Sequence, residues 1–150
     1  GYCNFFTSRT HDPNVWPPYM NGPGNKDIIF NELLIDWERE VTLVEGVFDA
    51  IVAGENSIPL LGSTLREDSK LFMKIVRNDT SVLLGLDADA QKKAMRLVKA
   101  LLAYDVEVRM MDTSGYKDIG EMPRDVFQQR KEKAPFIDSD TYLMRIALSA

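Results

Sequence analysis

The sequence contains few of the residues that thiol, histidine or soft-metal chemistry requires. Its 150 residues include one cysteine, Cys3, and one histidine, His11. A single cysteine excludes an internal disulfide framework and a cysteine-rich zinc site, and it suits a reducing cytoplasm. A Ser/His/Asp catalytic triad is implausible too, because the one histidine stands in a predicted loop. His11 stands beside a turn without a second histidine, so a surface position is favoured over a role as metal ligand or base.

Other absences narrow the class of protein. No apolar run approaches the length of a membrane span, and no glycine-rich phosphate loop ends in Gly-Lys-Ser or Gly-Lys-Thr. The 18 basic and 23 acidic side chains give a net charge of −5, which argues against a domain that coats nucleic acid by itself. An enzyme that acts on nucleic acid is still allowed, because catalytic carboxylates make a domain acidic and bound metal offsets part of their charge.

Apolar runs alternate with amphipathic segments, which predicts an α/β fold. The predicted strands are 41–44, 58–61, 82–86 and 106–111, and the predicted helices are 47–55, 66–77, 91–104, 123–133 and one from Asp138 or Ser139 to the end. This order implies a four-stranded, mainly parallel sheet flanked by helices. The unbroken apolar run 82–86 is the best candidate for the sheet centre, whereas Pro59 suits an edge or a strand start.

The first part of the chain has a different composition. A predicted strand at 2–6 is followed by a long loop rich in proline, glycine and asparagine. Residues 26–40 then predict a helix that leads into the sheet, with an apolar face formed by Ile28, Ile29, Leu33 and Trp37. We expect three parts, 1–26, 27–122 and 123–150, the last of them helical. Because the chain opens on Gly1 in mid-pattern, we expect an excised domain of a longer protein.

Carboxylates stand at the ends of the predicted strands. Glu45 follows the first strand, Asp87 and Asp89 follow the third, and Asp118 comes after the fourth. Ligands bind outside the carboxyl ends of parallel strands, so these acids should converge there. Oxygen ligands of this kind suit Mg²⁺, and two carboxylates two residues apart on extended backbone would face the same side. Taken singly, each acid is about as well explained as a cap of the following helix.

Asp49 and the basic residues also allow two interpretations each. Asp49 lies four residues after Glu45 on the nearest helix face, so it either orients Glu45 or is purely structural. Basic residues recur at helical spacing, and they either track a phosphate backbone or form a solvated helix face. They are Arg66, Lys70, Lys74 and Arg77, and then Lys92, Arg96 and Lys99, with Lys93 also on the polar face. The acidic balance favours the solvated face.

The acidic motifs together resemble a known family. Residues 45–49 (Glu-Gly-Val-Phe-Asp) match the E-G-x-x-D pattern, and residues 87–89 (Asp-Ala-Asp) the D-x-D pattern, of the Toprim domain shared by primases, topoisomerases and some nucleases. Residues 60–65 resemble the apolar-L-G-T-x-L segment of DnaG-like primases of bacteria and phages. Residues 117–121 (Lys-Asp-Ile-Gly-Glu) are similar to the K-D-x-N-E segment of phage primase-helicases.

The resemblance extends upstream and covers about residues 1–122. Residues 5–9 resemble the G-F-x-x-R segment of these primases, and residues 18–23 resemble their K-Y-L-N-S-P segment. Residues 1–26 would then be the end of the primase N-terminal subdomain. Two positions depart from the pattern, because Pro18 replaces a basic residue and Gly120 replaces the second aspartate of many bacterial relatives.

The resemblance implies roles for individual residues. Glu45, Asp87, Asp89 and Asp118 would hold Mg²⁺ or Mn²⁺, with Glu45, Asp87 and Asp89 catalytic. Asp49 would support them. The residues expected to contact nucleotide or template are Arg9, Tyr19, Asn21 and Lys117.

The implied activity is that of a DNA primase, a DNA-directed RNA polymerase and nucleotidyltransferase. It would make short RNA primers from NTPs on a single-stranded DNA template, with a replicative helicase as partner. We expect a phage-encoded protein in the bacterial cytoplasm, with no membrane partner. Two alternatives stay open: a Toprim nuclease that cleaves phosphodiester bonds with the same carboxylates, and a non-catalytic Toprim module that recruits other replication proteins.

Overall fold

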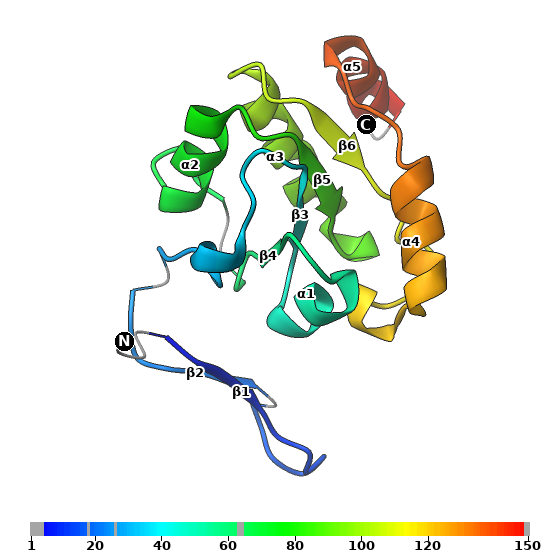
Figure 1. The fold of residues 1–150 in the computed structure, drawn as a ribbon. Helices are drawn as coiled ribbons and strands as arrows, with labels where there is room; N and C mark the ends of the chain where they lie inside the picture. Colours follow the sequence, from blue (N-terminus) through cyan, green and yellow to red (C-terminus); the bar gives the residue numbers. More distant parts are fainter. Residues whose placement is uncertain (1–4, 18, 26, 63–64, 149–150) are drawn as a thin grey trace.

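A four-stranded parallel sheet forms the centre of the protein (Figure 1). The computed structural model describes residues 5–17, 19–25, 27–62 and 65–148. The strands follow the order β4 (Ser57–Pro59), β3 (Val41–Val44), β5 (Val82–Gly85) and β6 (Val108–Met110), and every pairing is parallel. The predicted α/β fold is therefore confirmed. As predicted, β5 is a central strand and β4, with its proline, lies at an edge.

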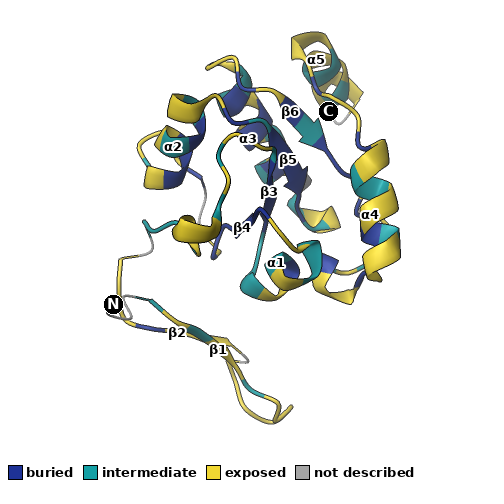
Figure 2. Ribbon diagram, in the orientation of Figure 1, coloured by how far each residue is buried: buried dark blue, intermediate teal, exposed yellow. Residues whose placement is uncertain are grey.

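Helices cover both faces of the sheet, which gives three layers. On one face lie α1 (Val47–Ala53), the 3₁₀ turn η3 (Ile119–Glu121) and α4 (Arg124–Lys133). On the other lie α2 (Lys70–Asn78) and α3 (Gln91–Leu102), and α5 (Ser139–Leu148) packs against α3. Figure 2 shows buried strands between helices whose outer faces are exposed. None of the helices in the described part of the chain combines the length and apolar character that a membrane span requires.

The apolar strand β5 supplies side chains to both layers of helices. Val82 and Leu84 join the larger buried cluster with Phe72 of α2, whereas Leu83 joins the smaller cluster with Phe127 of α4. Successive side chains of a strand point to opposite faces, so a strand covered on both sides needs apolar residues throughout. This burial fixes the sheet and therefore the positions of the residues that follow each strand.

The predicted helix at 26–40 is wrong. Within residues 27–40 the structure has only the short 3₁₀ turn η1 (Glu32–Leu34), and Leu33 is fully exposed. The backbone is held instead by Asn56, whose side-chain amide donates to the carbonyls of Asp36 and Glu40, each at 2.9 Å. Its side-chain oxygen accepts from the Asp36 amide at 2.8 Å. These long-range bonds satisfy backbone groups that a helix would pair internally.

The other helices differ from prediction mainly at their ends. The helix predicted at 66–77 begins at Lys70, because the hydroxyl of Ser69 accepts from the Phe72 amide at 3.3 Å and caps the first turn. The helices predicted in 123–150 are confirmed as α4 and α5. Asp138 accepts from the Thr141 amide at 2.8 Å, which is the capping interaction expected at the start of α5.

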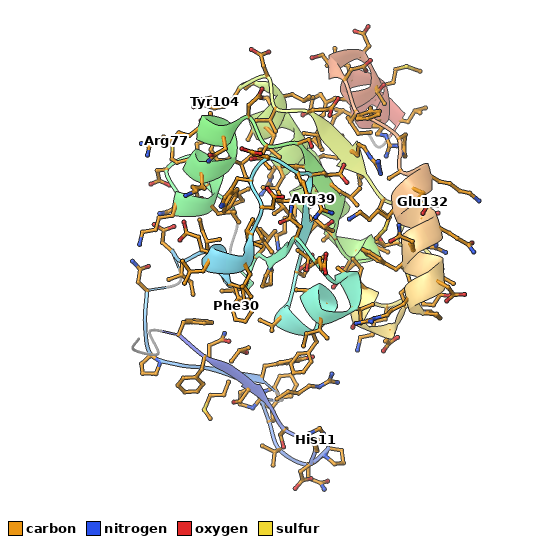
Figure 3. All side chains as sticks on the ribbon, in the orientation of Figure 1. His11, Phe30, Arg39, Arg77, Tyr104 and Glu132 are labelled. Carbon is orange, nitrogen blue, oxygen red and sulfur yellow. The ribbon has the colours of Figure 1, made fainter. Side chains whose placement is uncertain are left out.

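An antiparallel hairpin precedes the sheet. It pairs β1 (Thr7–Arg9) with β2 (Tyr19–Asn21), with Arg9 opposite Tyr19. Residues 2–4 of the strand predicted at 2–6 lie outside the described residues, and residues 5 and 6 are not in a strand, because the described strand begins at Thr7. His11 is exposed in the loop that extends away from the sheet, as Figure 3 shows. This agrees with the predicted surface position. The three-part division of the chain stays a prediction.

Candidate functional site

The strand ends form one side of a pocket of about 490 Å³. Val44 is paired with Gly85 across the two central strands, so Glu45 and Asp87 leave the sheet side by side. A β-carbon at Gly85 would lie 2.7 Å from the Cδ1 atom of the buried Ile119. This glycine therefore lets η3 pack against the strand end. The close packing brings the loop before η3 to the same edge of the sheet.

The predicted site residues gather in this pocket, with two exceptions. Those that line it are Glu45, Asp49, Asp87, Asp118, Tyr19, Asn21 and Lys117. Asp118 and Lys117 reach it from the loop after β6. That loop is held by Arg130, which donates to the carbonyls of Asp112 at 2.8 Å and Ser114 at 2.7 Å. The exceptions, Asp89 and Arg9, are not among the lining residues.

Asp49 joins the two backbone segments that carry the neighbouring acids. Its Oδ2 atom accepts from the Gly46 amide at 2.8 Å, and its Oδ1 atom accepts from the Gly120 amide at 2.9 Å. Burial raises the pKa of Asp49, and the two backbone donors act in the opposite direction. Gly46 directly follows Glu45 in the chain, and Gly120 lies two residues after Asp118. Asp49 therefore fixes the backbone beside Glu45 and Asp118, and its role as a support for the metal site stays a prediction.

The helix-cap interpretation applies to some of the acids and not to others. Asp118 caps η3, because its Oδ1 atom accepts from the Glu121 amide at 3.0 Å. Glu45 and Asp87 differ. In the described part of the chain, Glu45 Oε1 and Asp87 Oδ1 are buried and have no hydrogen-bond partner. Buried polar atoms are nearly always paired in native proteins, so these two oxygens are the atoms of the site that are available to a ligand or an ordered water.

The electrostatic environment of Asp87 also favours a cation. Burial, together with repulsion from the nearby carboxylates Glu45, Asp49, Asp118 and Asp89, raises its pKa to about 7. A positive charge in the pocket would stabilise the ionised form of each of these groups. The site as a whole therefore disfavours additional negative charge and attracts cations.

The residues fit a divalent cation that brings ligands of its own. Among the described residues, no three histidine, cysteine, aspartate or glutamate side chains stand close enough together to hold a metal ion by themselves. Mg²⁺, however, usually takes one or two protein carboxylates and completes its coordination with water and substrate phosphate. Glu45 Oε1 and Asp87 Oδ1 provide two such oxygens. The fit is therefore to a metal–phosphate complex rather than to a bare ion in a protein cage.

Aromatic rings from the hairpin and from α1 meet at the rim of the pocket. The ring centroids of Tyr19 and Phe48 are 6.0 Å apart. The guanidinium of Arg9 lies 5.3 Å from the Tyr19 centroid and 5.6 Å from the Phe48 centroid. Arg9 therefore does not line the pocket itself but contacts two residues that do, Tyr19 and Phe48. We call Arg9, Tyr19 and Phe48 the aromatic rim.

Comparison with known proteins identifies the fold. No protein-family model and no curated protein sequence matches the chain. A solved structure of the Aquifex aeolicus primase, comprising zinc-binding and RNA polymerase domains, superimposes with a TM-score of 0.70 and 21% identity, over 91% of this chain and 38% of that one. The chain has a Toprim fold. Its parallel sheet with strand-end carboxylates is the arrangement that the sequence motifs predicted.

Asp89 does not lie where extended backbone would direct it. The second acid of the Toprim D-x-D pattern falls in the 3₁₀ turn η2 (Ala88–Ala90), and it is exposed. The extended backbone that we expected over residues 87–89 is therefore wrong, because a 3₁₀ turn begins directly after Asp87. Its assignment as a catalytic metal ligand stays a prediction.

One residue that lines the pocket, Phe48, and one residue beside it, Lys93, were not found from the sequence. Phe48 lines the pocket, and the ammonium of Lys93 lies 3.3 Å from Glu45 Oε2. Sequence patterning had assigned Lys93 to the polar face of its helix. The available signals were local ones: Phe48 is an apolar residue next to Asp49 in the E-G-x-x-D motif, and Lys93 lies in the first helical turn after the D-x-D motif.

Proposed function

We propose that this Toprim domain is the catalytic core of a DNA primase, which makes short RNA primers on single-stranded DNA by metal-dependent nucleotidyl transfer. The observation that carries the proposal is the pair of buried, unpartnered oxygens, Glu45 Oε1 and Asp87 Oδ1, at neighbouring strand ends. The similarity to a primase in fold supports it. The replicative helicase as partner, the phage origin and the cytoplasmic location stay predictions from the family resemblance.

The four carboxylates of the pocket differ in how many of their oxygens are bonded within the protein. Glu45 and Asp87 would bind Mg²⁺ or Mn²⁺, which supplies charge neutralisation at the transferring phosphoryl group when bound. Asp118 has one oxygen committed to the Glu121 amide and a second one left to contribute. Asp49 has both oxygens on backbone amides, so it acts by orienting Gly46 and Gly120. A bound cation would favour the ionised form of Asp87, whose pKa is raised in the absence of metal.

The other pocket residues suit a nucleic-acid substrate. Lys117 is a lining cation that can contact phosphate, and Asn21 offers both a donor and an acceptor to the edge of a base or to ribose. The aromatic rim presents two partly exposed rings to the pocket, and every nucleobase has a face that stacks on such rings. A template base or an incoming nucleotide would be held between these groups and the strand-end carboxylates.

The decisive test is product analysis with the purified protein. A single-stranded DNA template, labelled NTPs and Mg²⁺ or Mn²⁺ are incubated together, and the products are separated by size. Template-dependent oligoribonucleotides support the primase proposal. Shortened DNA would instead show a Toprim nuclease. If neither product forms and calorimetry detects no Mn²⁺ binding, the domain is a non-catalytic recruitment module.

Replacing Phe48 with leucine is expected to weaken binding of single-stranded DNA or of NTP by about 5-fold or more. Leucine keeps an apolar side chain against Tyr19 but removes the ring, and stacking of one base on an aromatic side chain contributes roughly 1–3 kcal/mol. Fluorescence anisotropy with a labelled oligonucleotide and competition with NTP measure the two affinities. Phe48→Tyr keeps a ring and should bind like the wild type. Equal affinity for Phe48→Leu would mean that the ring only packs against the hairpin.

A further inference from the structure

Lys93 holds the carboxylate that the proposed metal would need. Its Nζ atom lies 3.3 Å from Glu45 Oε2, and the side chains of Lys93 and Glu45 are 24% and 25% exposed, so most of this ion pair is shielded from solvent. The other oxygen of the same carboxylate, Oε1, is buried without a hydrogen-bond partner among the described residues. Glu45 thus has one oxygen on an ammonium and one oxygen free to accept a ligand.

The direction of Lys93 is specific to that residue. It lies in the first turn of α3, directly after the loop that carries Asp87 from the end of β5. Its neighbour Lys92 is exposed and lines a separate groove with Tyr142 and Ile146 of α5. Two adjacent lysines therefore have different neighbours, α5 for Lys92 and Glu45 for Lys93. Lys93 is the one that joins the start of α3, which follows β5, to Glu45 at the end of β3.

The charges in the pocket explain why the ammonium of Lys93 lies beside Glu45. Four carboxylates line the pocket, namely Glu45, Asp49, Asp87 and Asp118. Repulsion among them is costly when they are buried without a counter-charge. The ammonium of Lys93 offsets part of this negative charge. A divalent cation on Oε1 would do the same, and the ammonium on Oε2 would repel it, so ammonium and metal ion compete for the negative charge of Glu45.

We propose that Lys93 is a positioning residue with two partners: it holds Glu45 while the site lacks metal, and it binds the phosphates of the nucleotide once a metal–nucleotide complex has taken Glu45. This inference rests on the proposed function. The lysine side chain has a flexible four-carbon stem and a compact charge with three donors, so its ammonium can move from one anion to a neighbouring one. A triphosphate that enters with the metal supplies that second anion.

The first arm of the test measures Mn²⁺ alone. Lys93→Gln removes the competing charge, so Mn²⁺ should bind about 3- to 10-fold more tightly than to the wild type in calorimetric titrations without nucleotide. Lys92→Gln makes the same change in net charge outside the pocket and should bind Mn²⁺ like the wild type. Lys93→Arg keeps the charge and should also resemble the wild type. Unchanged or weaker Mn²⁺ binding to Lys93→Gln overturns the inference.

The second arm compares ATP with AMP in saturating Mn²⁺. Lys93→Gln should lose several-fold in affinity for ATP and little for AMP, because only ATP carries the outer phosphates. Equal losses for the two nucleotides, or no loss for either, would overturn the phosphate contact. If the wild type binds no Mn²⁺, the proposed function fails and the inference fails with it. If the wild type binds Mn²⁺ and Lys93→Gln matches it, only the inference about Lys93 fails.

Discussion

Asp87→Asn is expected to reduce primer synthesis by about a hundred- to a thousand-fold or more while the protein stays folded. Asparagine has nearly the shape of aspartate but carries no charge, so it is a much poorer ligand for a divalent cation than the carboxylate whose Oδ1 atom is buried and unpartnered. Losing one preorganised electrostatic contact to the reacting phosphate has effects of this size in other enzymes. The measurement is the rate of oligoribonucleotide formation on a single-stranded template.

The control for this variant is Asp125→Asn. Asp125 is exposed in the first turn of α4 and does not line the pocket, so the same chemical change there should leave the rate unaltered. Circular dichroism and thermal unfolding show whether Asp87→Asn is folded. A folded Asp87→Asn variant with the wild-type rate would remove Asp87 from the reaction. The proposed metal site would then lose its central ligand.

The metal-free protein is expected to lose stability as the pH rises from about 5 to about 8. The pKa of Asp87 is raised in the folded state to about 7 from an ordinary value of 3.8. Between these values the folded state binds more protons than the unfolded state, so the free energy of unfolding falls as the pH rises and the loss is complete above the folded pKa. Because solvent reaches part of the pocket, we expect a loss on the order of 1–2 kcal/mol.

Urea unfolding in a chelator at pH 5.5 and pH 8 measures this loss. Asp87→Asn has no titrating group at this position, so it should gain stability relative to the wild type as the pH rises. Mn²⁺ should stabilise the wild type most at pH 8, where the carboxylate is ionised and ready to bind it. The aspartates with lowered pKa, Asp112 and Asp138, titrate below this range and leave it undisturbed. Parallel pH profiles for wild type and variant would contradict the electrostatic description of the pocket.

The sheet could be predicted from the sequence because burial on two faces leaves a local signature. The apolar run 82–86 and the proline of β4 indicate a central strand and an edge strand before any contact is known. The segment 27–40 could not be predicted in this way. Its apolar spacing suits a helix, but Asn56 pairs its carbonyls from a distance in sequence that no local pattern reveals. The helical propensity of this segment is overridden by its tertiary hydrogen bonds with Asn56.

The site was predictable to the extent that strand topology alone positions its residues. Glu45 and Asp87 follow paired strands, so their proximity is a consequence of the parallel sheet. The role of Asp49 depends on Gly120, which lies 71 residues later in the chain, and the motif alone left it open. Lys93 was assigned to a polar helix face, which is correct for Lys92. Periodicity defines which face a residue occupies but not which neighbour stands beside it.

The central claim is that Glu45 and Asp87 share a divalent cation together with nucleotide phosphates. Anomalous scattering from crystals soaked in Mn²⁺ and ATP tests it most directly. We expect a peak at roughly 2 Å from an oxygen of each of the two carboxylates, with phosphate oxygens completing the coordination and Lys93 turned away from Glu45. A peak bound by other residues, with Glu45 still paired to Lys93 and Asp87 Oδ1 still without a partner, would contradict the claim.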